Sequence, residues 1–143
     1  MQKLEKFIKS LELVKTEGKY DLGLVINKSG RDLVWEKIIP NSVKAEVFYE
    51  ENEAETLKAV QNVFKSGRWL ILELKDGLSA ELYAQLRSLS SRNRFQYIEG
   101  NEIKDIKMPD KTRIVVEGLE EVLDKINEVY PEFKNIFGPI IEI

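Results

Sequence analysis

Apolar residues recur along the chain in two patterns, one typical of amphipathic helices and the other of buried strands. The three-to-four-residue spacing of helices predicts helical segments at about 3–15, 52–65, 79–91 and 119–129, and one more between Ser29 and Pro40. Short apolar runs predict strands at 21–26, 44–49, 68–74, 111–116 and 139–143. Strands and helices therefore alternate five times, which indicates parallel βαβ units.

This alternation predicts one α/β domain over residues 1–143, in three α/β/α layers around a mainly parallel sheet of about five strands. The run RWLILEL has four apolar residues in succession, as in a strand covered on both faces. Segments 95–98 and 102–106 flank Glu99-Gly100-Asn101, a turn sequence that predicts a projecting hairpin near 95–106. The length, 143 residues, also favours a single domain.

Composition narrows the chemistry that the chain can perform. It contains no Cys and no His, which removes disulfides, thiol nucleophiles, imidazole catalysis and zinc sites built on these residues. Catalysis would then have to use carboxylates, Lys, Tyr or Ser, and a metal such as magnesium could still bind carboxylates. We expect no catalytic residue, no metal and no cofactor, and we favour a protein that is not an enzyme. The absence of a signal-like N-terminus and of any apolar run near 20 residues predicts a cytoplasmic protein without a membrane partner. Abundant Lys and Glu lean toward a thermophilic source.

The segment GLVINKSGRDLVWEKII has the layout of a phosphate-binding loop, in which a strand, a Ser-Gly turn and a helix follow one another. A Walker A loop requires G-x-x-x-x-G-K-[ST], but with Gly30 as its second glycine Val25 replaces the first, Arg31 the Lys and Asp32 the hydroxyl residue. We instead predict that Ser29 caps the helix and that Asp32 completes an S-x-x-D capping box. A carboxylate there would also repel an anion at the helix N-terminus.

The order of elements resembles the α/β core of AAA-type P-loop ATPases over most of the chain after residue 20. RWLILEL stands where that family has its Walker B strand, FQYIEGNEIKDIKMP resembles a β-hairpin insertion, and KTRIVVEG resembles the sensor-1 strand. YPEFKNIFGPIIEI resembles the end of the core. The resemblance implies a strand order of 5-1-4-3-2.

The same resemblance implies a degenerate core, because each functional position differs. Glu73 stands at the position of the metal-associated Asp, and Leu74 at that of the water-activating Glu. Glu117 replaces the polar sensor residue, and Ile136 replaces the arginine finger before Phe137. We find no counterpart of the α-helical lid.

Basic residues are interleaved with aromatic residues in segment 87–113, a pattern that can hold single-stranded nucleic acid. The alternative is a solvated helix end and a hairpin whose alternate residues face the core. The net charge of −3 favours this alternative. The candidate interaction surface comprises Arg87, Arg92, Arg94, Phe95 and Tyr97 of this segment. Trp35, which lies outside the segment on a helix that is apolar on most sides, is a further candidate.

Three functional hypotheses stay open, in this order. The first is a non-catalytic interaction or scaffold protein that binds a protein partner or itself as a homo-oligomer. The second is a divergent nucleotide-binding domain, in which a single cleft would bring together Ser29, Gly30, Arg31 and Glu73. The third is a nucleic-acid-binding module. The carboxyl ends of the predicted strands form an acidic mouth that suits a cation or a basic partner. They carry Asn27-Lys28-Ser29, Glu50-Glu51, Glu73 to Asp76 and Glu117-Gly118.

Overall fold

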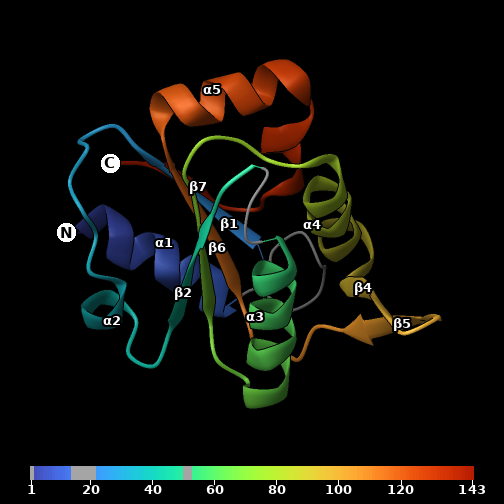
Figure 1. Ribbon diagram of the computed structural model, residues 1–143. Coiled ribbons are helices and arrows are strands. Elements are labelled where there is room, and N and C mark those ends of the chain that lie inside the picture. The colour runs from blue at the N-terminus through green and yellow to red at the C-terminus, as the bar shows by residue number, and fades with distance from the viewer. Residues whose placement is uncertain (1, 14–21, 50–52) are drawn as a thin grey trace.

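The computed structural model describes residues 2–13, 22–49 and 53–143 (Figure 1). Its helices are α1 (Gln2–Leu13), α2 (Trp35–Ile38), α3 (Glu53–Ser66), α4 (Ala80–Arg92), α5 (Glu120–Val129) and the 3₁₀ helix η2 (Phe133–Ile136). Its strands are β1 (Leu22–Asn27), β2 (Val43–Val47), β3 (Leu70–Leu74), β4 (Arg94–Glu99), β5 (Glu102–Lys107), β6 (Ile114–Leu119) and β7 (Ile140–Glu142). The ends of predicted elements at 14–15, 21 and 52 lie outside the described residues, as does Glu50-Glu51.

The five parallel strands are ordered β2-β3-β6-β1-β7. This confirms the three-layer α/β fold and the predicted order 5-1-4-3-2. One apolar cluster joins the sheet to α3, α4, α5 and η2, and a second cluster on the opposite face joins it to α1 and α2. The strands at the centre of the sheet are apolar on both faces because helices cover both of them.

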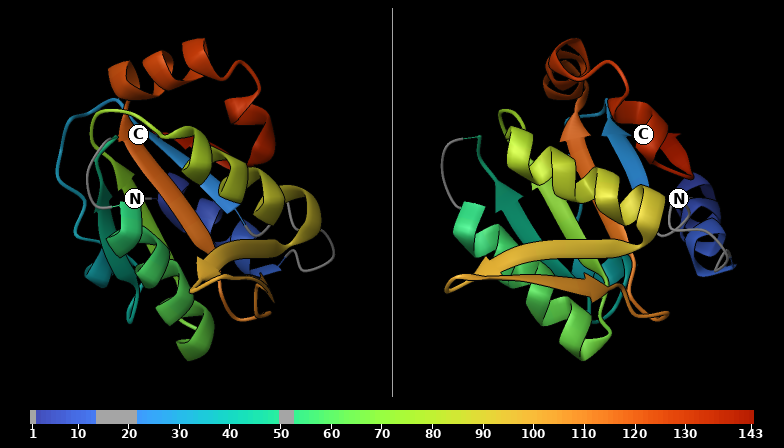
Figure 2. Two further views of the ribbon diagram at one scale, coloured as in Figure 1. Left: turned by 45° about the vertical axis from the view of Figure 1, so that its right-hand side comes forward. Right: turned by 90° about the vertical axis from the view of Figure 1, so that its right-hand side faces the viewer.

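The predicted hairpin is present as the antiparallel pair β4–β5, which lies across α3 in the right-hand view of Figure 2. Phe95 on β4 is fully buried, and its ring contacts that of Phe64 on α3 with centroids 5.9 Å apart. The base of the hairpin is therefore part of the core, while Ile103 near its tip is 72% exposed.

The predicted helix that begins at Ser29 is wrong. Residues 28–34 form a loop, and the only helix before Pro40 in this part of the chain is the four-residue α2, which Val34 precedes without a side-chain cap. The Asn27 side chain accepts a hydrogen bond from the Gly30 amide at 3.0 Å, an Asx-type turn that replaces the first helical turn. Asp32 therefore completes no capping box.

The connections that follow the two neighbouring central strands, β1 and β6, run to opposite edges of the sheet. β1 continues through α2, on the face of the second cluster, to β2 at the far edge. Its neighbour β6 continues through α5, on the opposite face, to β7 (Figure 1). Open α/β sheets bind ligands in the crevice outside the carboxyl ends of the strands at such a reversal. The fold thus points to the ends of β1 and β6 as the place to look for a site.

Candidate functional site

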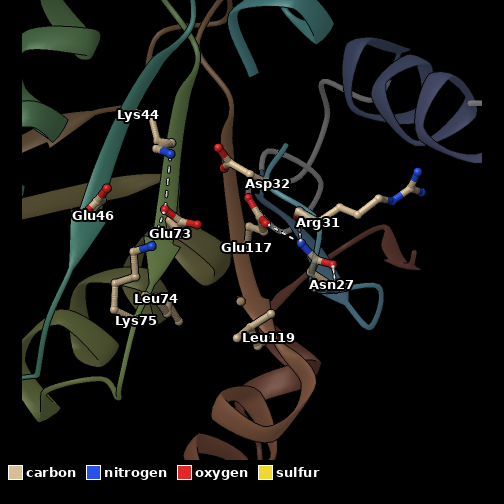
Figure 3. A pocket seen from close by; sticks show the side chains of 12 residues that line it. Asn27, Arg31, Asp32, Lys44, Glu46, Glu73, Leu74, Lys75, Glu117 and Leu119 are labelled. Carbon is tan, nitrogen blue, oxygen red and sulfur yellow. Dashed lines mark hydrogen bonds and ion pairs between the residues drawn. The ribbon is translucent and has the colours of Figure 1, made fainter. Parts of the chain in front are cut away.

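A cleft of about 370 Å³ opens at the carboxyl ends of β1, β3 and β6, with part of β2 on one wall (Figure 3). The strand ends supply most of its surface, and the loop after β1 supplies the rest. Its lining residues are Asn27, Gly30, Arg31, Asp32, Lys44, Glu46, Glu73, Leu74, Lys75, Glu117, Gly118 and Leu119.

A row of three carboxylates crosses the cleft. The strand register pairs Glu46 on β2 with Glu73 on β3, and Glu73 with Glu117 on β6. Paired residues of parallel strands point to the same face, so these side chains leave the same face of the sheet from strands about 5 Å apart. Glu46 is exposed, Glu73 is partly buried and Glu117 is buried. The row therefore runs from solvent into the interior.

Two lysines offset the central carboxylate. The ammonium groups of Lys44 and Lys75 lie 3.3 Å and 3.1 Å from the same oxygen of Glu73 (Figure 3). Burial lowers the pKa of Lys44, but the attraction of Glu73 and of Asp32 outweighs it, and the net pKa is raised. Lys44 is therefore held as a cation by the carboxylates around it.

Glu117 lies at the inner end of the row and is only 3% exposed. Trp35 Nε1 donates to one of its oxygens at 2.6 Å, and Asn27 Nδ2 donates to the other at 3.1 Å. Burial raises the pKa of Glu117, although both hydrogen bonds oppose this change. Both oxygens of Glu117 thus already have donors within this chain.

The loop after β1 uses its backbone amides internally. The N–H groups of Lys28 and Ser29 donate to the Ile143 carbonyl at 2.7 and 3.0 Å. Those of Gly30 and Arg31 donate to the side-chain oxygens of Asn27 and Ser29, at 3.0 and 3.3 Å. A phosphate-binding loop directs successive N–H groups at its ligand. Here four consecutive N–H groups already have acceptors within the protein.

The structure brings three of the four residues proposed for nucleotide binding into the cleft. Gly30, Arg31 and Glu73 line it, as the nucleotide-binding hypothesis requires. Ser29 does not line it, and its hydroxyl donates to Asn27 at 2.9 Å instead. The Arg31 side chain extends away from Glu73 and Glu117 (Figure 3). Convergence is confirmed for three residues, and nucleotide binding stays a prediction.

Within residues 2–13, 22–49 and 53–143, no three acidic side chains are grouped so that they could hold a metal ion. Over the same ranges, no helix is long and apolar enough to cross a membrane.

The basic residues proposed as an interaction surface are engaged with their own neighbours. The guanidinium of Arg87 lies 5.7 Å from the centroid of the Tyr83 ring, Arg92 donates to the Ser88 hydroxyl at 3.1 Å, and Arg94 pairs with Asp105 at 3.6 Å. Tyr97 pairs with Lys104 in the hairpin, but its side chain lies outside the described parts. These contacts favour the solvated-hairpin interpretation.

The prediction that Phe95 and Trp35 belong to this interaction surface is wrong. Phe95 is fully buried and Trp35 is 2% exposed, so neither can present its ring to a partner of the folded chain. Phe95 faces inward because alternate hairpin residues pack on α3 and α4. The indole N–H of Trp35 faces inward, where it donates to the buried carboxyl group of Glu117. Sequence pattern could not show the second contact, because the two residues are 82 positions apart.

Arg113 also belongs to the interior. It is 2% exposed. Its Nε donates to the carbonyl of Leu11 at 2.7 Å, and one terminal nitrogen donates to the carbonyls of Asp110 and Thr112. It thereby ties the last turn of α1 to the start of β6. The sequence pattern places Asn27 at the carboxyl end of a strand but does not predict its hydrogen bonds to the loop, although the Ser-Gly pair that follows Lys28 is a turn signal.

Comparison of the sequence with models of protein families finds no match, and comparison with curated proteins finds no significant match. The site therefore has to be interpreted from its own geometry.

Proposed function

We propose that this chain is a non-catalytic α/β interaction protein, derived from a degenerate P-loop-type core, whose carboxyl-end cleft receives a cationic group of a protein partner. The observation that carries this proposal is the self-contained loop after β1, whose four consecutive N–H groups donate to Ile143, Asn27 and Ser29. The loop offers no cradle for phosphate, and the strand order agrees with descent from a core that once had one.

The charge within the cleft favours a cation. Four carboxylates line it, from Asp32, Glu46, Glu73 and Glu117. The guanidinium of Arg31 points away, so the facing cations are Lys44 and Lys75, and both are paired with Glu73 (Figure 3). Asp32 and Glu46 are exposed and form no ion pair within the described residues. They are the groups that an incoming ammonium or guanidinium would meet.

The test is a titration of the ¹⁵N-labelled full chain with the dipeptide acetyl-Arg-Arg-amide, followed by amide chemical shifts. We expect saturable shifts at Asp32, Lys44–Glu46 and Glu73–Lys75, which weaken as salt is raised. The double variant Asp32→Asn/Glu46→Gln should reduce the affinity about threefold or more, as for the loss of exposed ion pairs.

The matched control is Glu128→Gln, which removes an exposed carboxylate from α5 and should leave the affinity unchanged. The proposal fails if the dipeptide shifts no cleft resonance, or if the double variant and Glu128→Gln bind it equally well.

A divergent nucleotide-binding domain is the second candidate, favoured by the presence of Gly30, Arg31 and Glu73 in one cleft. It requires the loop to give up its internal hydrogen bonds and Arg31 to turn inward. It therefore predicts that Mg–ATP shifts the amide resonances of residues 27–31, whereas the interaction protein predicts no such shift. Nucleic-acid binding by segment 87–113 stays a prediction that no contact described here favours.

A further inference from the structure

A second depression, of about 600 Å³, lies at the opposite end of the sheet from the cleft. Three turns form it: residues 40–41 before β2, residues 66–69 before β3, and Lys111 before β6. These turns lie at the lower end of the molecule in Figure 1, away from α5. Its volume falls within the range of pockets that bind small molecules, about 300–1,000 Å³.

The charge of this depression is of one sign. Arg68 and Lys111 are the only ionisable side chains among the residues that line it, although the whole chain carries a net charge of −3. Lys111 forms no ion pair within the described residues. A concave surface with cations alone concentrates anions. The depression thus differs from the cleft, where both lysines are paired with Glu73 and further carboxylates are present.

Local structure holds Arg68 in place. Its Nε donates to the carbonyl of Asn41 at 2.6 Å, and a terminal nitrogen lies 3.4 Å from the carbonyl of Ser42. The preceding residue, Gly67, has a positive φ of 71°, and a side chain at that position would begin 3.7 Å from Cβ of Lys111. The turn therefore places Lys111 beside Gly67, the residue that precedes Arg68, and both cations line the same depression. The guanidinium is ordered before any ligand arrives, which lowers the entropic cost of binding.

Trp69 adds an aromatic wall to the depression. It is partly buried against the second apolar cluster and also lines the depression. Tryptophan beside cations suits a ligand that joins a flat ring to a negative charge, because the ring stacks on the indole while the charge meets the cations.

We propose that this depression binds a small phosphorylated compound that carries an aromatic ring, with its phosphate on Arg68 and Lys111 and its ring against Trp69. The site is independent of the cleft at the carboxyl end. It can be present whether or not the cleft receives a cationic partner.

The test uses phenyl phosphate, followed by amide and indole chemical shifts of the ¹⁵N-labelled full chain. Inorganic phosphate supplies the charge without the ring, and phenol supplies the ring without the charge. We expect phenyl phosphate to bind more tightly than either and to shift the Gly67 amide, the Trp69 indole and the Lys111 amide.

Lys111→Gln should weaken the binding of phenyl phosphate about fivefold, as for loss of one charge-assisted contact. Lys111 is exposed, so this variant is expected to fold, and Arg68→Gln provides a second test. The control is Lys125→Gln on α5, which removes an exposed lysine elsewhere. The proposal is overturned if phenol binds as well as phenyl phosphate, if the shifts fall at residues 27–31, or if Lys111→Gln and Lys125→Gln bind equally.

Discussion

At the scale of single residues, Glu117 is a buried carboxyl group whose two oxygens both accept hydrogen bonds. Enclosing a carboxyl group costs free energy unless donors replace its water, and here Trp35 and Asn27 do so. The same contacts anchor Trp35 beneath the cleft and hold the loop after β1 in place. Sequence alone placed Glu117 at the end of a strand. It could not supply the donors, since one is 82 and the other 90 positions away.

The raised pKa of Glu117 gives a pH dependence with a definite sign. The folded chain holds this proton more tightly than the unfolded chain, so the contribution of Glu117 to stability falls as pH rises from the ordinary value of 4.5 to the raised value. Glu117→Gln no longer titrates there. The free energy of unfolding of the wild type, relative to Glu117→Gln, should therefore decrease between pH 4 and pH 7.

Urea unfolding at a series of pH values measures this difference. Asp32, Lys44 and Glu73 are present in both proteins, so the comparison isolates the group at position 117. Glu128→Gln accounts for the change in net charge. A difference between wild type and Glu117→Gln that stays constant, or that grows with pH, would contradict the account.

Trp35→Phe tests the same hydrogen bond by removing its donor, the indole N–H that contacts Glu117. The change keeps most of the buried aromatic surface but removes the donor to Glu117, which should lower the free energy of unfolding at pH 7 by about 2 kcal/mol. Trp69→Phe, at a partly buried position, is the control. Chemical denaturation of both variants gives the comparison, and equal stabilities would show that the Trp35–Glu117 contact contributes little.

At the scale of elements, the two periodicities located the helices and strands well because burial imposes them. Gly67 ends α3 with a positive φ, and its N–H donates to the carbonyl of Val63. The segment after β1 was misjudged because Ser29 and Asp32 fit a capping box. The Gly30 amide donates to the side-chain oxygen of Asn27 instead, and a turn forms where a helix was expected.

The packing of α1 on β1 depends on Gly23. A Cβ there would lie 2.5 Å from Phe7 and 3.0 Å from Leu11, and both of these side chains are buried. Gly23→Ala should therefore push α1 off the sheet and lower the free energy of unfolding by about 1–3 kcal/mol.

In Gly23→Ala, the rate of amide hydrogen exchange, compared with that of the wild type, should rise more in α1 than in α3. The control is Gly30→Ala, where a side chain would meet nothing within 4 Å although φ is 72°. We expect that change to cost about 1–2 kcal/mol through left-handed backbone strain, without effect on α1. Unchanged protection of α1 in Gly23→Ala would contradict the packing described.

At the scale of the whole molecule, the alternation of strands and helices predicted the α/β layers and the mainly parallel sheet. The strand order was predicted only from the resemblance to the core of AAA-type P-loop ATPases, because alternation alone leaves several orders open. The composition of the cleft could be foreseen in part, since the strand ends were visibly acidic. The pairing of Lys44 and Lys75 with Glu73, and the basic depression at the other end of the sheet, depend on three-dimensional neighbours that no local pattern encodes. The two ends of the sheet thus differ in charge: carboxylates predominate in the cleft, and cations line the depression.

The most direct test of the central claim, that the carboxyl-end cleft is closed to nucleotides, is a titration of the ¹⁵N-labelled chain with Mg–ATP and, in parallel, Mg–ADP. We expect the amide resonances of residues 27–31 and of Gly118 to stay unchanged up to millimolar nucleotide. Shifts confined to Gly67, Trp69 and Lys111 would belong to the depression and leave the claim intact. Saturable shifts at residues 27–31 with micromolar affinity, about −8 kcal/mol, that are lost in Arg31→Gln would contradict it.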